Sequence, residues 1–222
     1  MLKKLLALFL PFAISINAHA DLVDGSFESA DPWSYAYFQG GFDTPWHTTA
    51  PDNLIEIWNG ANMGVPAYHG ANFAELNANY VSTLYQDVNG LGDNNQINWH
   101  FAHRGRYGVD VMQLSITDLG ADQTYGTFDD TIIYQNNFSA DNTAWQFHTG
   151  TITSIGNLTR FAFTAVSAVG GSTQGNFIDY CGFGANAIPS PSSLSILGIA
   201  VMIVRKRRSE EHTSELQSRQ YL

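Results

Sequence analysis

The segment from Asn98 to Asp110, NWHFAHRGRYGVD, places histidine, arginine and aspartate side chains within a few residues of one another. Its first part alternates apolar and polar residues, which predicts a strand that ends near His103. The chain then passes through Arg104 and Arg106. A guanidinium group suits a carboxylate, a planar pair of hydroxyl groups or an aromatic face. We therefore expect recognition chemistry to be concentrated in this loop.

Cations are scarce in the rest of the chain. Between residues 21 and 187 there are 17 aspartate and glutamate residues but only three cations, Arg104, Arg106 and Arg160. Nucleic acid and anionic lipid are excluded as partners, because both are bound through clustered cations. A strongly acidic surface remains compatible with neutral glycans and divalent cations.

The two loop arginines have an alternative, structural role. One or both could pair with Glu56, Glu75 or Asp110 and fix the loop instead of contacting a ligand. This alternative applies more readily to one arginine than to both.

The first 20 residues have the pattern of a secretory signal peptide. Lys3 and Lys4 precede an apolar run from Leu5 to Ile14, and Ala18-His19-Ala20 forms a small-x-small cleavage site. We expect the mature chain to begin at Asp21. The apolar run is shorter than the ~20 residues of a membrane span, which argues against a retained anchor.

Residues 188–207 combine a Pro-Ser-Pro turn, an apolar run and a basic cluster in the order IPSPSSLSILGIAVMIVRKR. This segment resembles the PEP-CTERM sorting signal of Gram-negative bacteria. Ser190 stands where that family usually has glutamate, and the apolar run of 11 residues is short. The resemblance implies export through the inner membrane, handling by exosortase-type sorting machinery and transient membrane association. A cell-surface or extracellular-matrix location would follow.

The last segment, residues 208–222, contains RSEEHTSELQS, which resembles a translated sequencing adapter. We exclude it from inferences about fold and function. A genuine acidic and polar tail is the alternative.

Residues 21–187 have the length of one domain with a sizeable core. Short strand-like runs are separated by Gly, Asn, Asp and Pro, which predicts an all-β fold, a β-sandwich of jelly-roll type. The expected strands cover residues 22–27, 54–58, 73–76, 83–88, 96–103, 111–117, 132–138, 144–152, 159–166 and 176–183. The acidic stretch between residues 118 and 130 lacks EF-hand spacing, so we expect a solvated hairpin loop there.

Several blocks together carry a resemblance to the galactose-binding-like jelly rolls of secreted bacterial proteins, which are related to carbohydrate-binding modules and to the plant DUF642 proteins. The blocks are DGSFE, IEIW, GVPAYHGANFAELNA, LYQDV, FAHRGRYGVDVMQL, NTAWQFHTG and GNFIDYCGF. They extend over nearly the whole of residues 21–187. Membership of such a fold does not by itself assign a ligand.

In these jelly rolls, a glutamate near the start of the domain and an aspartate near its end commonly meet around a structural calcium ion. Glu28 and Asp179 stand at those places, and hard cations prefer oxygen ligands. The resemblance therefore implies calcium at Glu28 and Asp179. The alternative is that both are ordinary carboxylates at strand ends.

The resemblance also points to three blocks, IEIW, AELN and HRGR, as the ligand face, and the residue chemistry agrees. Trp58 could stack on a sugar ring, while carboxylate, amide and guanidinium groups bind its hydroxyls. Core packing is the alternative for Trp58, and a hydrogen bond at a strand end is the alternative for His103. The candidate ligand-binding residues are Glu56, Trp58, Glu75, Asn77, His103, Arg104, Arg106 and Asp110.

These observations predict an exported, non-catalytic, carbohydrate-binding protein of the cell surface or exopolysaccharide matrix, with a polysaccharide or glycan as its partner. One alternative is a structural or adhesive matrix protein that binds another protein. The other is a glycoside hydrolase that uses Glu56 and Glu75 as its paired carboxylates. The sequence contains no serine nucleophile elbow, zinc-protease motif or Walker loop, which favours the non-catalytic prediction.

Overall fold

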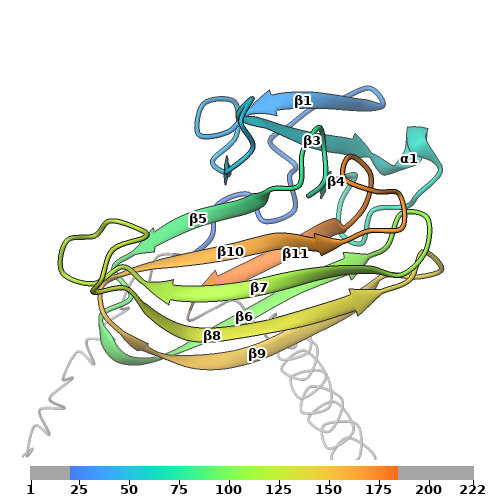
Figure 1. The fold of residues 1–222 in the computed structure, drawn as a ribbon. Coiled ribbons are helices and arrows are strands. Elements are labelled where there is room, and N and C mark those ends of the chain that lie inside the picture. Colours follow the sequence, from blue (N-terminus) through green and yellow to red (C-terminus); the bar gives the residue numbers. More distant parts are fainter. Residues whose placement is uncertain (1–20, 185–222) are drawn as a thin grey trace, which may run out of the picture.

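The computed structural model describes residues 21–184 (Figure 1). The predicted signal peptide, the sorting segment at residues 188–207 and the adapter-like residues 208–222 lie outside the described residues. No helix within residues 21–184 is long and apolar enough to cross a bilayer.

Two antiparallel sheets form this part of the chain, as Figure 1 shows. The six-stranded sheet has the order β1-β3-β4-β11-β6-β9 and consists of β1 (Tyr35–Gln39), β3 (Leu54–Asn59), β4 (Asn72–Glu75), β11 (Phe177–Gly184), β6 (Asp93–Arg104) and β9 (Gln146–Ile155). The five-stranded sheet has the order β2-β5-β10-β7-β8 and consists of β2 (His47–Thr48), β5 (Thr83–Asn89), β10 (Leu158–Ser167), β7 (Asp110–Asp118) and β8 (Thr131–Ala140). A single helical turn, α1 (Gly60–Met63), follows β3. The predicted all-β jelly-roll sandwich is confirmed.

The strand predictions differ from the structure near the start of the domain. The expected strand at residues 22–27 is wrong, because Asp24 and Phe27 have φ values of 52° and 60°, which are incompatible with an extended backbone. Turns occupy this region instead. The short strands β1 and β2 were not predicted, whereas the other nine expected runs coincide with β3 to β11. The acidic stretch at 118–130 is the hairpin connection between β7 and β8, as expected.

Strand alternation places the main core between the sheets. Met112, Leu114 and Ile116 of β7 are fully buried, and Phe161 and Phe163 of β10 pack beside them. Each such side chain stabilises the fold by roughly 1.5–3 kcal/mol through its burial. The same alternation turns every second residue of β3 and β4 to the opposite face of the six-stranded sheet.

A second, smaller apolar cluster forms on that opposite, outer face. It consists of Trp58 from β3, Phe73 from β4 and Phe177 from β11, whereas Ile57 and Ala74 belong to the main core. Met63, Val65, Ala67 and Trp145 pack against this cluster and partly cover it. The outer face is therefore apolar near α1. Farther from α1, the same face carries polar side chains, among them those of Glu56 and Glu75.

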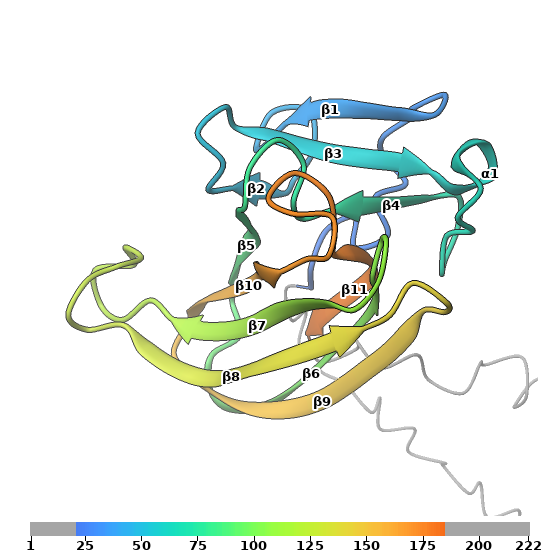
Figure 2. The same ribbon diagram turned by 45° about the vertical axis from the view of Figure 1, so that its right-hand side comes forward.

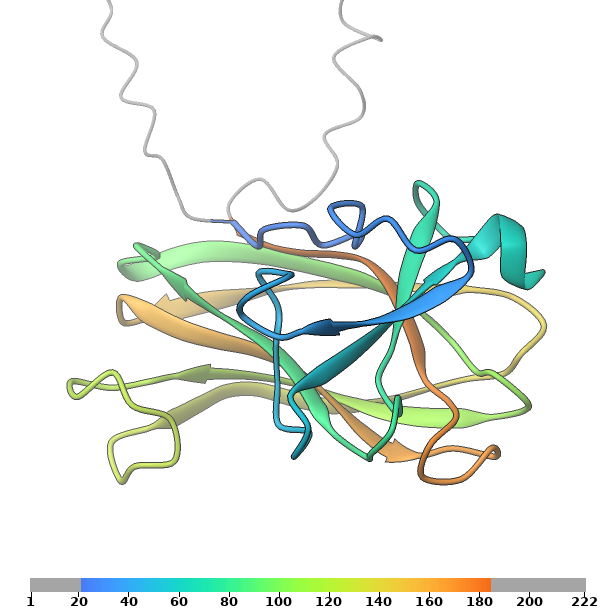
Figure 3. The ribbon, with the colours of Figure 1, turned by 90° about the horizontal axis from the view of Figure 1, so that it is seen from above.

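Two loops lie against this face. Residues 105–109 connect β6 to β7, and residues 168–176 connect β10 to β11. The second loop, drawn in orange, stands beside β4 and below β3 in Figure 2. Seen from above, β3 runs obliquely to the long strands of the sandwich (Figure 3). Three of the polar candidates, Glu56, Glu75 and Arg106, lie between β3 and these two loops.

Candidate functional site

Strand register brings sequence-distant groups into one row on the outer face. Tyr37 pairs with Glu56, Glu56 with Glu75, Glu75 with Phe177, and Phe177 with Arg104. Directly opposed residues on one face have Cβ atoms about 4.5–5.5 Å apart. The row therefore places two carboxylates side by side in the six-stranded sheet.

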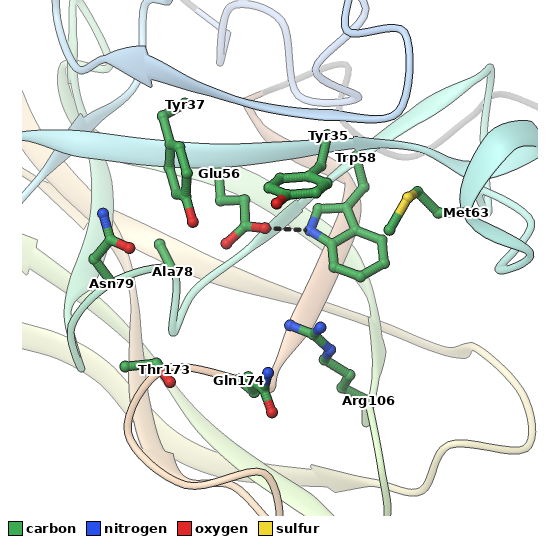
Figure 4. A pocket seen from close by; sticks show the side chains of 10 residues that line it. All are labelled: Tyr35, Tyr37, Glu56, Trp58, Met63, Ala78, Asn79, Arg106, Thr173 and Gln174. Atoms are coloured by element: carbon green, nitrogen blue, oxygen red, sulfur yellow. Dashed lines mark hydrogen bonds between the residues drawn. The ribbon is translucent and has the colours of Figure 1, made fainter.

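A pocket of about 360 Å³ opens at the β1 and β3 end of this row (Figure 4). This volume lies in the range that small-molecule sites occupy. Aromatic, carboxylate, guanidinium and amide groups all contribute to its wall. The lining residues are Tyr35, Tyr37, Glu56, Trp58, Met63, Ala78, Asn79, Arg106, Thr173 and Gln174.

Arg106 connects the loop at 105–109 to the sheet through Glu75. Its Nη1 donates to both carboxylate oxygens of Glu75, at 3.0 and 2.9 Å, and the side chain of Glu75 is completely buried. The backbone N–H of Gly175 also donates to Glu75 Oε1, at 2.5 Å. Gly175 has a φ of 149°, and a Cβ there would approach Ala168 to 2.3 Å, so only glycine fits. The predicted structural pairing is thus confirmed for Arg106.

The paired carboxylates have perturbed acidities. Burial raises the pKa of Glu75 to about 7, and the neighbouring charge of Glu56 adds to this rise, while Arg106 opposes it. Burial also raises the pKa of Glu56, and the hydrogen bond from Trp58 counteracts this effect. One guanidinium group therefore faces two poorly solvated carboxylates.

Trp58 lines the pocket but is not the stacking surface that we expected. It is only 5% exposed, and its Nε1 donates to Glu56 Oε1 at 2.9 Å. The guanidinium carbon of Arg106 lies 4.7 Å from its ring centroid. The open aromatic surface comes instead from Tyr35 and Tyr37, which are 48% and 42% exposed. Alternation along β1 turns both rings to the same side.

Asp110 does not line the pocket, but it holds both loops in place. Its buried carboxylate accepts hydrogen bonds from three backbone N–H groups, those of Arg106 at 2.9 Å, Val169 at 2.8 Å and Asn176 at 3.0 Å. The carboxylate has no exposure through which it could reach a ligand. This corrects its predicted role in ligand binding.

Asn77 and His103 are also buried, and neither lines this pocket. Asn176 joins them: its Oδ1 lies 3.0 Å from His103 Nε2, and its Nδ2 donates to Asn77 Oδ1 at 3.0 Å. Burial lowers the pKa of His103 to about 4, so the imidazole is neutral at pH 7. The alternative of a hydrogen-bonded histidine at a strand end describes His103, and neither residue belongs to the wall of the pocket beside Tyr35 and Tyr37.

Arg104 does not reach the pocket. Its Nη2 donates to the carbonyl oxygen of Asn142 at 2.7 Å on the exposed side of the sheet. The structure therefore gathers Glu56, Trp58 and Arg106 around one cavity, with Glu75 directly behind Arg106, and leaves Arg104 outside.

No protein-family model matches this sequence, and no curated protein matches it. Among solved structures, the chain is similar to the CBM22-1 xylan-binding domain of Xyn10C from Paenibacillus barcinonensis, with 9% identity and a TM-score of 0.47 over 75% of this chain and 95% of that one. TmCBM61, in complex with β-1,4-galactotriose, is similar with 15% identity and a TM-score of 0.40 over 63% of this chain and 88% of that one. These similarities concern the arrangement of strands, and a shared arrangement does not assign a ligand.

The predicted calcium ligands Glu28 and Asp179 both hold the segment of residues 68–72. Glu28 Oε1 accepts hydrogen bonds from the N–H groups of Ala71 and Asn72, at 2.9 and 2.8 Å. Asp179 Oδ2 accepts from Tyr68 and His69, at 2.7 and 2.9 Å. Burial raises the pKa of Asp179 to about 7, and the charge of Glu28 contributes to this rise.

In these contacts, backbone N–H groups already donate to Glu28 Oε1 and Asp179 Oδ2, two of the oxygens that would have to bind a cation. Within residues 21–184, no group of three or more His, Cys, Asp or Glu side chains could hold a metal ion. A calcium ion takes six to eight oxygen ligands, which the two carboxylates as arranged do not provide. The observed geometry fits the anchoring of a loop better than a calcium cage, and calcium remains a prediction.

Melting with and without a chelator tests this prediction. If calcium binds at Glu28 and Asp179, EDTA should lower the melting temperature of the wild type and leave that of Asp179→Ala unchanged, because ligand binding to the folded state stabilises it. Differential scanning calorimetry with added CaCl₂ measures both shifts. An identical melting temperature with EDTA and with calcium would contradict the prediction.

Sequence reasoning missed several pocket residues. Tyr35 and Tyr37 belong to SYAYF, whose alternating aromatic residues are a strand signal that could have revealed β1. Asn79, Thr173 and Gln174 lie in loops and reach the site only through tertiary structure. No local pattern marks residues of that kind.

Proposed function

We propose that this protein is an exported, non-catalytic module that binds a glycan in the pocket beside Tyr35 and Tyr37. One observation carries the proposal: two half-exposed tyrosine rings border a cavity of about 360 Å³ that also presents a carboxylate, a guanidinium group and side-chain amides. This is the combination that a sugar requires, because its C–H face packs on an aromatic plane and its hydroxyls need donors and acceptors.

The shape of the aromatic wall supports the proposal. The rings of Tyr35 and Tyr37 are 6.1 Å apart and lie at 88° to each other, which forms a corner. Figure 4 shows Glu56 between Tyr37 and Trp58, with Tyr35 beside Trp58. Asn79 and Gln174 approach from the opposite loops and supply amide groups. A pyranose ring in this corner would have an apolar contact on one side and hydrogen-bonding partners on the other.

The geometry disfavours a hydrolase that uses Glu56 and Glu75. A glycosidase needs both carboxylates in contact with the scissile bond or with a water molecule beside it. The side chain of Glu75 is fully buried, and its two oxygens accept hydrogen bonds from Arg106 and Gly175. It therefore cannot reach a substrate unless the loops at 105–109 and 168–176 move apart.

Export and surface location form part of the proposal and rest on sequence patterns alone. The signal-peptide pattern at residues 1–20 and the PEP-CTERM-like order at residues 188–207 support export and exosortase-type sorting. The scarcity of cations in the body of the chain supports a partner that is neither nucleic acid nor anionic lipid. The proposed setting is the cell surface or the exopolysaccharide matrix.

A glycan array with the double variant Tyr35→Ala/Tyr37→Ala tests the proposal. We expect the wild type to retain at least one class of glycan and the variant to bind it about tenfold or more weakly, because aromatic contacts dominate the energy of such sites. Isothermal titration calorimetry with the best ligand measures the loss.

Phe128→Ala provides a matched control, since this aromatic side chain is 99% exposed in the loop between β7 and β8 and does not line the pocket. Its affinity should equal that of the wild type. An array without any retained glycan would refute glycan binding. Capture of a deglycosylated envelope protein through the same tyrosines would instead support the adhesive alternative.

A further inference from the structure

Glu56 has a carboxylate oxygen that the protein does not use. The residue is 4% exposed, and its Oε1 accepts the hydrogen bond from Trp58 Nε1. Among the described residues, Oε2 accepts no hydrogen bond, and Figure 4 shows it directed away from Trp58 within the pocket wall. This oxygen lies at the wall of the open pocket, where a donor group of a ligand can bind it.

The charge around this oxygen is unbalanced. Arg106 is the single cation that lines the pocket, and its Nη1 is engaged by both oxygens of Glu75. Elsewhere in the described chain, Arg104 binds the carbonyl oxygen of Asn142 and Arg160 binds Asp87. Two carboxylates thus share one guanidinium group, and the carboxylate of Glu56 faces the pocket without a cation of its own.

The aromatic corner adds a second attraction for positive charge. The negative face of an aromatic ring attracts an ammonium group within about 6 Å. Tyr35 and Tyr37 present two such rings at a right angle, and both line the same pocket as Glu56. Trp58 is less available, because Arg106 already lies over its ring. Two half-exposed rings and one open carboxylate oxygen together suit a small cation.

We propose that the glycan recognised at this pocket carries a protonated amine, and that its class is a polysaccharide with N-deacetylated amino-sugar residues. The ammonium group is placed at Glu56 Oε2 between Tyr35 and Tyr37, and the pyranose ring packs on the tyrosines. We expect glycans that carry carboxylate or sulfate groups to bind more weakly, since Arg106, the single cation among the residues that line the pocket, is paired with Glu75. This inference rests on the proposed glycan binding and specifies its ligand.

Calorimetric titration with three hexasaccharides tests the inference. The probes are β-1,4-linked hexamers of glucosamine, N-acetylglucosamine and glucose, used in low salt at pH 7, where the amines are partly protonated and Glu75 is partly ionised. We expect the glucosamine hexamer to bind about tenfold or more tightly than the other two, the size expected for one partly desolvated cationic contact. High salt should reduce this preference, because it screens the charge of Glu56.

Glu56→Gln is the decisive variant. Glutamine keeps the shape and the acceptor for Trp58 Nε1, so the fold is preserved while the charge is removed. We expect this change to abolish the preference for glucosamine, so that the variant binds the hexamers of glucosamine and glucose with equal affinity. Asp93→Asn is the matched control, because Asp93 is exposed on β6 and does not line the pocket; the preference should persist there.

The outcomes separate this inference from the proposed function. Equal binding of all three hexamers that is lost in Tyr35→Ala/Tyr37→Ala would overturn the amine preference and leave glycan binding intact. Stronger binding of an oligogalacturonate would also overturn it. Competition by a lysine-rich peptide as strong as that by the glucosamine hexamer would overturn the assignment to a glycan. Failure of every saccharide to bind would refute both proposals.

Discussion

Replacement of Arg106 by alanine is expected to lower the free energy of unfolding by about 3 kcal/mol at pH 8, because it leaves a charged carboxylate buried without its partner. The side chain of Glu75 has no exposure, and that of Arg106 is 17% exposed. The Gly175 N–H would remain as the other donor to Glu75. Urea titration followed by tryptophan fluorescence measures the change.

The loss should depend on pH in a defined direction. The pKa of Glu75 in the folded protein is raised to about 7, above its ordinary value, so the folded state favours the protonated carboxyl. The stability contributed by this group is therefore fully present below its unfolded pKa, and it declines as the pH rises through about 7. Without Arg106 the pKa rises further. We expect Arg106→Ala to be much less destabilising at pH 5 than at pH 8.

Arg104→Ala is the natural control, because Arg104 belongs to the same segment and donates to a carbonyl oxygen on the exposed side of the sheet. Its substitution should cost less than about 1 kcal/mol at either pH. The double variant Arg106→Ala/Glu75→Gln should recover much of the loss at pH 8, since it removes the isolated charge. Equal losses for the two arginines, or a loss for Arg106→Ala that ignores pH, would contradict the ion-pair argument.

Local patterns in the sequence carry most of the information about this fold. Met112, Leu114 and Ile116 alternate with polar residues, and this period places them in the core without any knowledge of the partner strands. The strand predicted at residues 22–27 from local pattern is wrong. Its apolar residues suit a strand, but the left-handed backbone of Asp24 and Phe27 is set by tertiary contacts, among them the hydrogen bond from Trp46 Nε1 to Asp24 O.

The site was less predictable, because its residues come together through strand register and loop docking. Glu56 and Glu75 were identified from their blocks, yet only the β3–β4 register shows that they are opposed neighbours. Asp110, Asn77 and His103 are residue types that often bind ligands. Here they are buried and make hydrogen bonds that hold the loops in place. Charge and hydrogen-bonding capacity can be read from residue type. Exposure cannot, and it decides which polar groups meet a ligand.

Asp110→Ala is expected to have an effect as large as the loss of Arg106, with a further consequence for binding. The variant removes the acceptor of three backbone N–H groups, the buried one of Asn176 and the partly buried ones of Arg106 and Val169. Hydrogen bonds to charged groups contribute roughly 1.5–3 kcal/mol each, and partial rehydration of the loops reduces the total, so we expect a loss of about 3 kcal/mol. Thermal and urea unfolding measure it.

The same carboxylate connects the two loops that carry Arg106, Thr173 and Gln174 to the pocket, so glycan affinity should also fall in Asp110→Ala under conditions where the protein remains folded. Asp141→Ala is the matched control, because Asp141 also accepts a backbone N–H, from Thr143 at 2.9 Å, but in an exposed turn. Its replacement should cost much less stability than that of Asp110, since water can replace the lost acceptor. Equal destabilisation by the two variants would show that burial of Asp110 does not set its contribution. Unchanged glycan affinity in folded Asp110→Ala would show that the loops hold their positions without it.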